Sequence, residues 1–311
     1  MEIPINGQIT IGHGGGRTVY FTGFVLLPKH NVGLFVSYNG NHGEDAPETF
    51  TQAFMDHYYP GSPVAVPQPK PEFANRAKRF TGIYRNSRHN ENTFEKFVEA
   101  PNDISIKLTT HNTLETGGYE WMETEDPLVF IREDGHDRLI FKEDNAGNIA
   151  SFMFQKWPVF VYLKKSWFDS IVFTGLWGGV CLLFFLSTVV VWPLKFLFNL
   201  RKRKQVAENA VLLPARIARW LAWSFSTLSL IFTVIFASMV FNGALLDKGQ
   251  DAATGLFLIP PLTLVMAIGM VIFTGLAWKR RYWSLSGRVY YSLLTLSAVV
   301  FLGWLNYFNL I

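Results

Sequence analysis

The sequence is poor in cysteine and in charge, and both shortages limit what the protein can be. One cysteine in 311 residues excludes an internal disulfide framework. Charged residues make up 17% of the chain, against 49% hydrophobic and 16% aromatic residues, which is an apolar balance for a soluble protein. The net charge of +4 is gathered in a few loops, so it indicates membrane orientation and argues against nucleic acid as a partner.

Metal-ligand patterns and a leader are missing as well. The acidic turns at 133–137 and 144–148 lack the twelve-residue calcium-loop pattern with its closing Glu, so we interpret both as ordinary hairpin turns. We therefore expect no metal and no cofactor. The start, Met1-Glu2-Ile3-Pro4, has neither a basic region nor an apolar core, and so is not typical of a signal peptide.

The first sixty residues contain a glycine-rich stretch followed by strand patterns. The residues His13, Gly14, Gly15 and Gly16 lead into β-forming segments at 19–27 and 32–39, with a turn at 28–31 between them. Such near-continuous apolar runs predict strands that are covered on both faces inside a larger sheet. Three glycines leave room for a ligand or another backbone to approach closely.

This arrangement resembles the β-lactamase-like serine hydrolases, which include class C β-lactamases, DD-peptidases and related esterases. There a Lys-Thr-Gly or His-x-Gly triad lies on the strand lining the active site, and a Pro-Glu-x-x-x-Gly turn leads to a strand ending in Asn. The counterparts here are His13-Gly14-Gly15, the turn at 28–33 and Asn39. The fold implied for residues 1–60 is the last hairpin and helix of that α/β fold.

The resemblance also implies catalytic roles for His13, Gly14, Gly15 and Gly16. His13 would face the substrate carboxylate or the leaving group. The N–H of Gly16 would be one of two oxyanion-hole donors. A competing interpretation is a simple strand-end bulge with a surface histidine. A phosphate-binding loop is disfavoured, because such loops lead into a helix and a strand pattern follows here.

The family's nucleophile, a Ser with Lys three residues later, does not occur in the 311 residues. Its Tyr-x-Asn motif is matched at 84–86 and 307–309, but in a second domain and in an apolar span, so we interpret both matches as chance. We therefore expect the C-terminal portion of a membrane-anchored hydrolase that is inactive alone and whose parent acts on cell-wall or secreted small substrates. The alternative is a non-enzymatic multi-pass membrane protein whose extracytoplasmic β domain binds a partner or an envelope ligand.

The hairpin is followed by a predicted helix, a linker and a second domain. A helix is predicted at 48–59, a proline-rich linker at 61–71, and a β-rich accessory domain, an antiparallel meander or barrel, at 72–165. The strands expected in that domain open at 80–85 and continue at 94–98, 104–108, 119–122, 128–132, 139–142 and 149–155, separated by turn signals.

Residues 166–311 predict a transmembrane domain. Four apolar segments, at about 170–192, 220–241, 255–278 and 289–310, are each long enough to cross a bilayer as a helix. We expect Pro193 to end or bend the first of them. The Gly175 and Gly179 pair predicts either a close helix contact or ordinary small residues. Ionisable side chains lie only at span ends, at Asp169 and Lys195, which favours an anchor over a transport path.

Loop charges predict the orientation in the cell membrane. The loops at 199–219 and 279–288 are rich in Lys and Arg, whereas the loop between the second and third spans has Lys248 as its one cation. Basic loops stay in the cytoplasm. The N-terminal domains and the C-terminus are then expected outside the cytoplasm, with the lipid bilayer as the protein's main partner.

Overall fold

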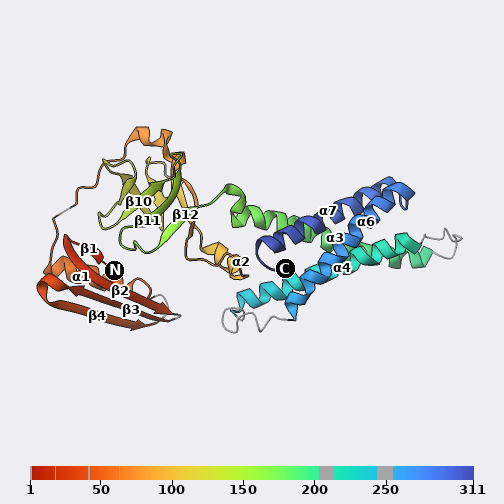
Figure 1. The fold of residues 1–311 in the computed structure, drawn as a ribbon, viewed down its shortest axis with the longest axis horizontal. Coiled ribbons are helices and arrows are strands. Elements are labelled where there is room, and N and C mark those ends of the chain that lie inside the picture. Colours follow the sequence, from red (N-terminus) through yellow and green to blue (C-terminus); the bar gives the residue numbers. More distant parts are fainter. Residues whose placement is uncertain (1, 18, 41–42, 63, 203–212, 244–254) are drawn as a thin grey trace. The chain divides into compact units, whose positions relative to one another are not determined.

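A computed structural model describes residues 2–17, 19–40, 43–62, 64–202, 213–243 and 255–311 (Figure 1). The chain divides into two compact units. The first contains the N-terminal residues up to Arg88 together with Asn102–Ser166. The second contains His89–Pro101 and Trp167–Ile311.

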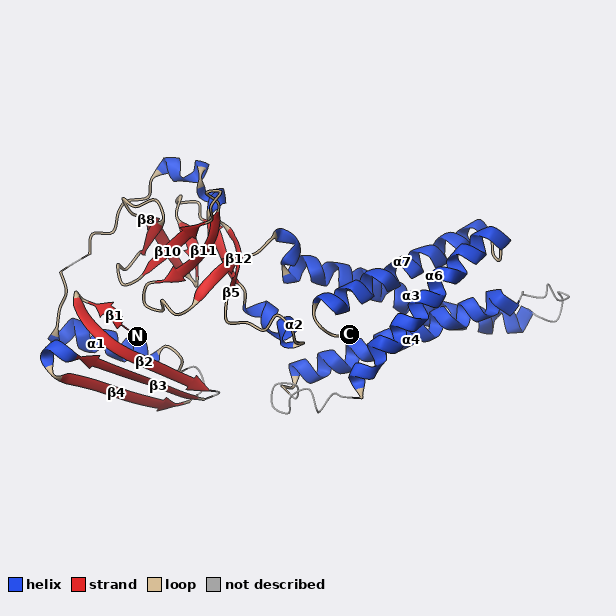
Figure 2. Cartoon of the chain, in the orientation of Figure 1, coloured by secondary structure: helices blue, strands red, loops and turns tan. Residues whose placement is uncertain are grey.

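The first unit begins with a four-stranded antiparallel sheet (Figure 2). The predicted strands and the turn between them are confirmed, and the glycine-rich stretch is itself a strand that pairs with the next one. Strand β1 was not expected; a two-residue turn with Asn6 and Gly7 at positive φ joins it to β2. In order the strands are β1 (Glu2–Ile5), β2 (Gln8–Arg17), β3 (Tyr20–Leu27) and β4 (Val32–Asn39).

Helix α1 (Ala46–Tyr58) covers one face of this sheet and begins two residues before its predicted start. Val25, Leu27 and Met55 form the buried core between them. Gly23 allows the helix to come close, because a Cβ at this position would lie 2.9 Å from the Cβ of Pro47.

The opposite face of the sheet contradicts the expectation that the strands are covered on both faces. Apolar side chains on this face remain open in the part of the chain that the structure describes: Phe35 is 69% exposed, Ile9 52%, and Phe24 and Ile11 42% each. The strand pattern was identified correctly, but no described element packs on these side chains. We call Ile9, Ile11, Phe24, Leu26 and Phe35 the open apolar face.

The β-rich domain is a closed eight-stranded antiparallel barrel, in the order β10-β11-β12-β5-β6-β7-β8-β9. Its core is a cluster of aromatic rings, among them Phe73, Phe80, Tyr84, Phe130, Phe141 and Phe152. Short strands β7 and β12 were not expected. The strands are β5 (Gly82–Asn86), β6 (Ile104–Leu108), β7 (Leu114–Thr116), β8 (Tyr119–Glu123), β9 (Val129–Arg132), β10 (Arg138–Glu143), β11 (Ile149–Phe154) and β12 (Val161–Lys164).

One predicted strand is wrong. Residues 94–98 fall at helix α2 (Glu95–Glu99), in the connection between β5 and β6. Phe94, Phe97 and Val98 have the i, i+3, i+4 spacing of a helix face. In the second unit Phe97 lies 5.5 Å from Trp304 and 5.2 Å from Phe308, between ring centroids. The segment therefore forms no barrel strand and packs instead on the C-terminal helices.

Four helices of the second unit are long and apolar enough to cross a membrane. They are α3 (Ile171–Lys202), α4 (Leu213–Phe241), α6 (Ile259–Arg280) and α7 (Leu285–Tyr307). The four expected long apolar helices are thus confirmed, with shifted bounds. Pro193 does not end the first helix, which continues to Lys202. Helix α4 begins seven residues earlier than predicted, because its charged first turns lowered the local hydropathy. Lys248 lies outside the described residues.

The glycine pair in α3 makes no close helix contact among the described residues. A Cβ at Gly175 or Gly179 would meet no atom within 4 Å, so they are ordinary small residues of the span. The close approach between helices occurs instead at Gly269 of α6, where a Cβ would lie 2.6 Å from the Cδ2 of Leu221 in α4.

Candidate functional site

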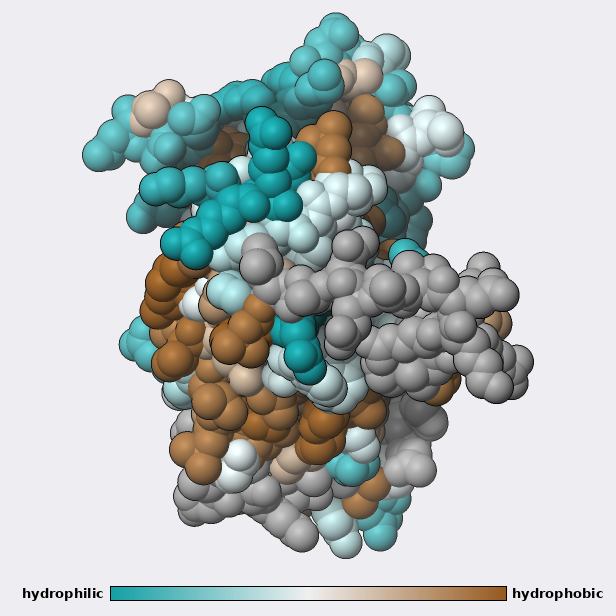
Figure 3. Space-filling view, turned by 90° about the vertical axis from the view of Figure 1, so that its right-hand side faces the viewer, coloured by the Kyte–Doolittle hydropathy of each residue, from teal (hydrophilic) through white to brown (hydrophobic). Residues whose placement is uncertain are grey.

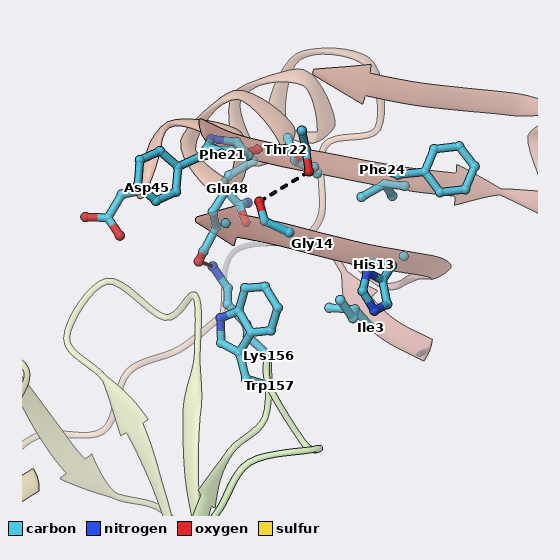
Figure 4. Close-up of a pocket in the computed structure, with 18 of the residues that line it drawn as sticks. Ile3, His13, Gly14, Phe21, Thr22, Phe24, Asp45, Glu48, Lys156 and Trp157 are labelled. Atoms are coloured by element: carbon cyan, nitrogen blue, oxygen red, sulfur yellow. Dashed lines mark hydrogen bonds and ion pairs between the residues drawn. The ribbon is translucent and has the colours of Figure 1, made fainter. Parts of the chain in front are cut away.

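The glycine-rich part of β2 borders a cleft of about 350 Å³ (Figure 4). Gly12, Gly14 and Gly16 share the face of the sheet that α1 covers, because alternate residues of a strand face the same side. Without side chains at these positions, the space between the sheet and the residues at the start of α1 stays empty. The lining includes the following: Ile3, Gly14, Phe21, Asp45, Glu48, Lys156 and Trp157.

The predicted site residues divide between two faces. His13 and Gly15 alternate with Gly14 and Gly16, so the His13 side chain stands on the open apolar face, beside its cross-strand partner Phe24. The structure therefore brings the four residues together in one strand, as the sequence predicted. Alternation places the histidine side chain on the other face of the strand from Gly14 and Gly16, although His13 is still one of the residues that line the cleft.

The backbone of Gly14 and Gly16 faces an open edge of the sheet. The two-residue turn makes Ile5 and Gln8 a hydrogen-bonded pair, and the register has no bulge, so the N–H groups of even-numbered β2 residues point away from β3. Strand β1 pairs with β2 only as far as Ile11. Beyond that point no described strand occupies the edge, and the N–H of Gly16 is directed outward from it.

Lys156 and Trp157, from the connection between β11 and β12, were missed by the sequence reasoning. The indole of Trp157 lies 3.4 Å from the position of a Cβ at Gly14, and Lys156 Nζ donates to Glu48 Oε1 at 2.6 Å. Both contacts lie within the first unit. Their separation of more than a hundred residues from β2 left no local signal that could have revealed them.

A second cleft, of about 380 Å³, lies at one end of the barrel. Aromatic side chains dominate its lining, which includes Tyr119, Trp121, Phe154, Phe160 and Tyr162. Arg132 and Asp137 also line it, and the hydroxyl of Thr116 in its wall is buried without a hydrogen-bond partner among the described residues. Burial raises the pKa of Asp137, although the N–H groups of Arg138 and Lys156 donate to this carboxylate and lower it.

The raised pKa of Asp137 gives a test of this environment. An acid with a higher pKa in the folded state binds its proton more tightly when folded, so stability falls as pH rises above 3.8 through the folded pKa. We expect Asp137→Asn, which keeps an acceptor oxygen, to raise the melting temperature at neutral pH and to lose this gain at acidic pH. Thermal unfolding at both pH values measures it, with the exposed Glu125→Gln as control. A gain that does not depend on pH would contradict the assignment.

Other candidate groups are already occupied. The Tyr84 hydroxyl is buried and donates to the carbonyl of Phe80, and burial raises its pKa, so it is not available as a base. Tyr307 donates to Asp169 at 2.7 Å. These contacts agree with chance matches to Tyr-x-Asn. Asp144 accepts from the N–H groups of Ala146 and Asn148, as in an ordinary turn. Among the described residues no cluster of three or more His, Cys, Asp or Glu side chains could hold a metal ion.

Comparisons with known proteins add little to this geometry. No protein-family model matches the chain, and no curated protein matches it. Among solved structures it is similar to "Crystal structure of SurE with D-Leu" and "Crystal structure of SurE", each at 14% identity and a TM-score of 0.29 over 50% of this chain. The chain spans about a third of those chains, 35% and 34%. A similarity this low carries no argument about fold or function.

Proposed function

We propose that residues 1–60 form the glycine-rich wall of a β-lactamase-like serine hydrolase site, carried by a membrane-anchored protein. The open edge at Gly16 carries the proposal, because an outward N–H on an unpaired strand edge is the donor that an oxyanion hole needs. The open apolar face supports it, since an exposed apolar patch of this kind suits a surface that another part of a domain covers. The nucleophile would have to come from residues outside the 311.

The proposed chemistry is amide or ester hydrolysis through an acyl-serine. A serine oxygen attacks the substrate carbonyl carbon, and a Lys or Tyr base accepts its proton. The carbonyl oxygen becomes the oxyanion to which Gly16 N–H donates. When the intermediate collapses, the amine or alcohol leaves with a proton, and water then hydrolyses the acyl-serine. His13, which lines the cleft, would bind the substrate carboxylate or the leaving group.

The first test reads the DNA upstream of Met1 in the same frame. An open frame encoding Ser-x-x-Lys and then Tyr-x-Asn is expected, and the longer protein should hydrolyse a simple ester. The 311-residue chain alone should not. A stop codon close upstream, or an extended protein with no hydrolysis, would overturn the proposal.

Within the longer protein, a pair of substitutions isolates the donor. Gly16→Pro removes the N–H at an edge position where no ladder hydrogen bond is lost, whereas Gly16→Ala keeps it. We expect Gly16→Pro to lower kcat by about 10²- to 10³-fold relative to Gly16→Ala, as removal of an oxyanion donor does. The comparison matters because a Cβ here would lie 2.9 Å from the Phe21 ring, so both variants need the ring to move. Equal kcat values for the two variants would exclude the donor role.

The second candidate is non-enzymatic binding by the barrel domain. The aromatic cleft with Arg132 and the unpartnered Thr116 hydroxyl supports it, since ligand sites are apolar concavities with a few polar groups. A stop codon close upstream of Met1 would favour this binding function over the hydrolase.

The proposed membrane orientation has its own prediction. The basic ends of the helices face the cytoplasm, and the sheet and barrel lie outside. In a Cys181→Ser background, Gly40→Cys should react with a membrane-impermeant maleimide on intact cells. Lys279→Cys should react only after the cells are opened. The reverse pattern would invert the topology.

A further inference from the structure

The two ends of the helical unit differ in whether their charged side chains have partners inside the protein. At the end that contains α2, charged groups have partners inside the protein: Lys96 Nζ lies 3.3 Å from Glu91 Oε2, and Asp169 accepts from Tyr307. At the other end, where α6 turns into α7, the described cations form no ion pair with any described acidic residue. They are Lys195, Arg216, Arg219, Lys279, Arg280, Arg281 and Arg288.

Two of these arginines are held by tryptophan rings. The guanidinium carbon of Arg219, in α4, lies 5.5 Å from the ring centroid of Trp283, and that of Arg288, in α7, lies 5.0 Å from the ring of Trp278. A cation over an indole face is attracted by the ring quadrupole. The two stacks therefore fix the direction of guanidinium groups that would otherwise be free to move.

Further contacts hold each stack in place on α7, and we call the two stacks together the arginine–tryptophan cluster. The Tyr291 hydroxyl donates to the carbonyl of Ala218, next to Arg219, and its ring lies 5.0 Å from Trp283. The Trp278 Nε1 donates to Ser292 Oγ, whose hydroxyl donates to the Arg288 carbonyl. The arginines thus belong to a packed structure built from α4, α6 and α7, and are not loose side chains on a loop.

The cluster has donors in excess. Among the described residues, Trp283 Nε1, Tyr282 Oη and Arg288 Nε are buried and lack a hydrogen-bond partner. Arginine and tryptophan side chains only donate. Neither Arg219 nor Arg288 forms an ion pair with a described acidic residue, so the cluster has no negatively charged partner among the residues that the structure describes. Figure 3 faces this end and shows both hydrophilic and hydrophobic side chains on it.

We propose that this arginine–tryptophan cluster binds the phosphate of an anionic phospholipid in the adjacent leaflet. Phosphate oxygens accept from planar guanidinium groups with bidentate geometry, and the apolar helix surface beside the cluster accommodates the acyl chains. Tryptophan is the residue expected at headgroup level. The site is independent of the proposed hydrolase and of which leaflet the basic end faces.

The test titrates the full chain, in neutral detergent, with short-chain phosphatidylglycerol and follows its melting temperature. Phosphatidylglycerol should raise the melting temperature with saturation. Phosphatidylcholine with the same chains and inorganic phosphate should not. An equal shift with phosphatidylcholine would overturn the proposal. An equal shift with inorganic phosphate would show a free-anion site and overturn the lipid assignment.

Matched variants distinguish binding at this cluster from nonspecific attraction of the lipid to positive charge. Arg219→Gln with Arg288→Gln should weaken phosphatidylglycerol binding by about 30-fold or more. Lys279→Gln with Arg280→Gln removes the same charge from exposed positions and should weaken it by less than about threefold. Equal losses would overturn the site. If the glutamine pair does not fold, Arg219→Lys with Arg288→Lys keeps the charge without the planar fork, and should still bind about tenfold more weakly; unchanged binding would overturn the proposal.

Discussion

Asp103→Ala is expected to destabilise the barrel by about 3–5 kcal/mol, because the carboxylate neutralises two buried cations. Arg85 Nε donates to Asp103 Oδ1 at 2.7 Å and its Nη2 donates to Oδ2 at 3.0 Å, and Lys165 Nζ donates to Oδ2 at 3.2 Å. The three side chains are between 6% and 9% exposed. Truncation would leave two like charges close together in a site shielded from water, which costs more than the ion pair contributes when intact.

Hydrogen exchange of the full chain measures this effect locally. Amides of β5 and β6, which flank the cluster, should exchange about 10²- to 4 × 10³-fold faster if they exchange through barrel unfolding. Glu143→Ala is the matched control, because its pair with Arg79 is 34% and 44% exposed and should contribute less than about 1 kcal/mol. A change for Asp103→Ala no larger than that of the control would show that the cluster does not stabilise the barrel.

Phe130→Ala should cost a comparable amount, about 3–5 kcal/mol, for a different reason. The ring is fully buried and lies 4.9 Å from Phe80 and 5.4 Å from both Phe73 and Phe141, between centroids, in edge-to-face contacts. Its removal leaves a cavity that the closed barrel cannot collapse around, and it also removes the aromatic pair energies.

The control for Phe130 is the same substitution at an exposed position. Phe35→Ala, on the open apolar face, should change the free energy of unfolding of the chain by no more than about 0.5 kcal/mol. Urea unfolding of each variant provides the values. A similar loss of unfolding free energy at both positions would mean that the open apolar face is covered in solution. In the proposed hydrolase this face is covered only by the rest of the domain, so the 311-residue chain alone should not show that loss at Phe35.

The site was predicted in part because its signal is local. The histidine and glycines are consecutive in sequence, and the hairpin after them has a period of two, so sequence placed the strand and its turn correctly. The same alternation separates His13 from Gly14 and Gly16, a consequence that the prediction left out. Trp157 packs against Gly14 although the two residues are far apart in sequence. Periodicity describes neighbouring residues, so it could not predict this contact.

Hydrophobic periodicity and hydropathy by themselves determined most of the elements. They are properties of neighbouring residues, and so they identified the hairpin, most barrel strands and four apolar helices. Tertiary structure alone decided the rest. Strands β7 and β12 have three and four residues, too few for a pattern, and exist because the barrel closes through them. Helix α2 did have a local signal, the helical spacing of Phe94, Phe97 and Val98, which the strand prediction missed. The contact of Arg219 with Trp283 instead joins residues far apart in the chain, and contacts of that kind are fixed by packing, which local sequence does not encode.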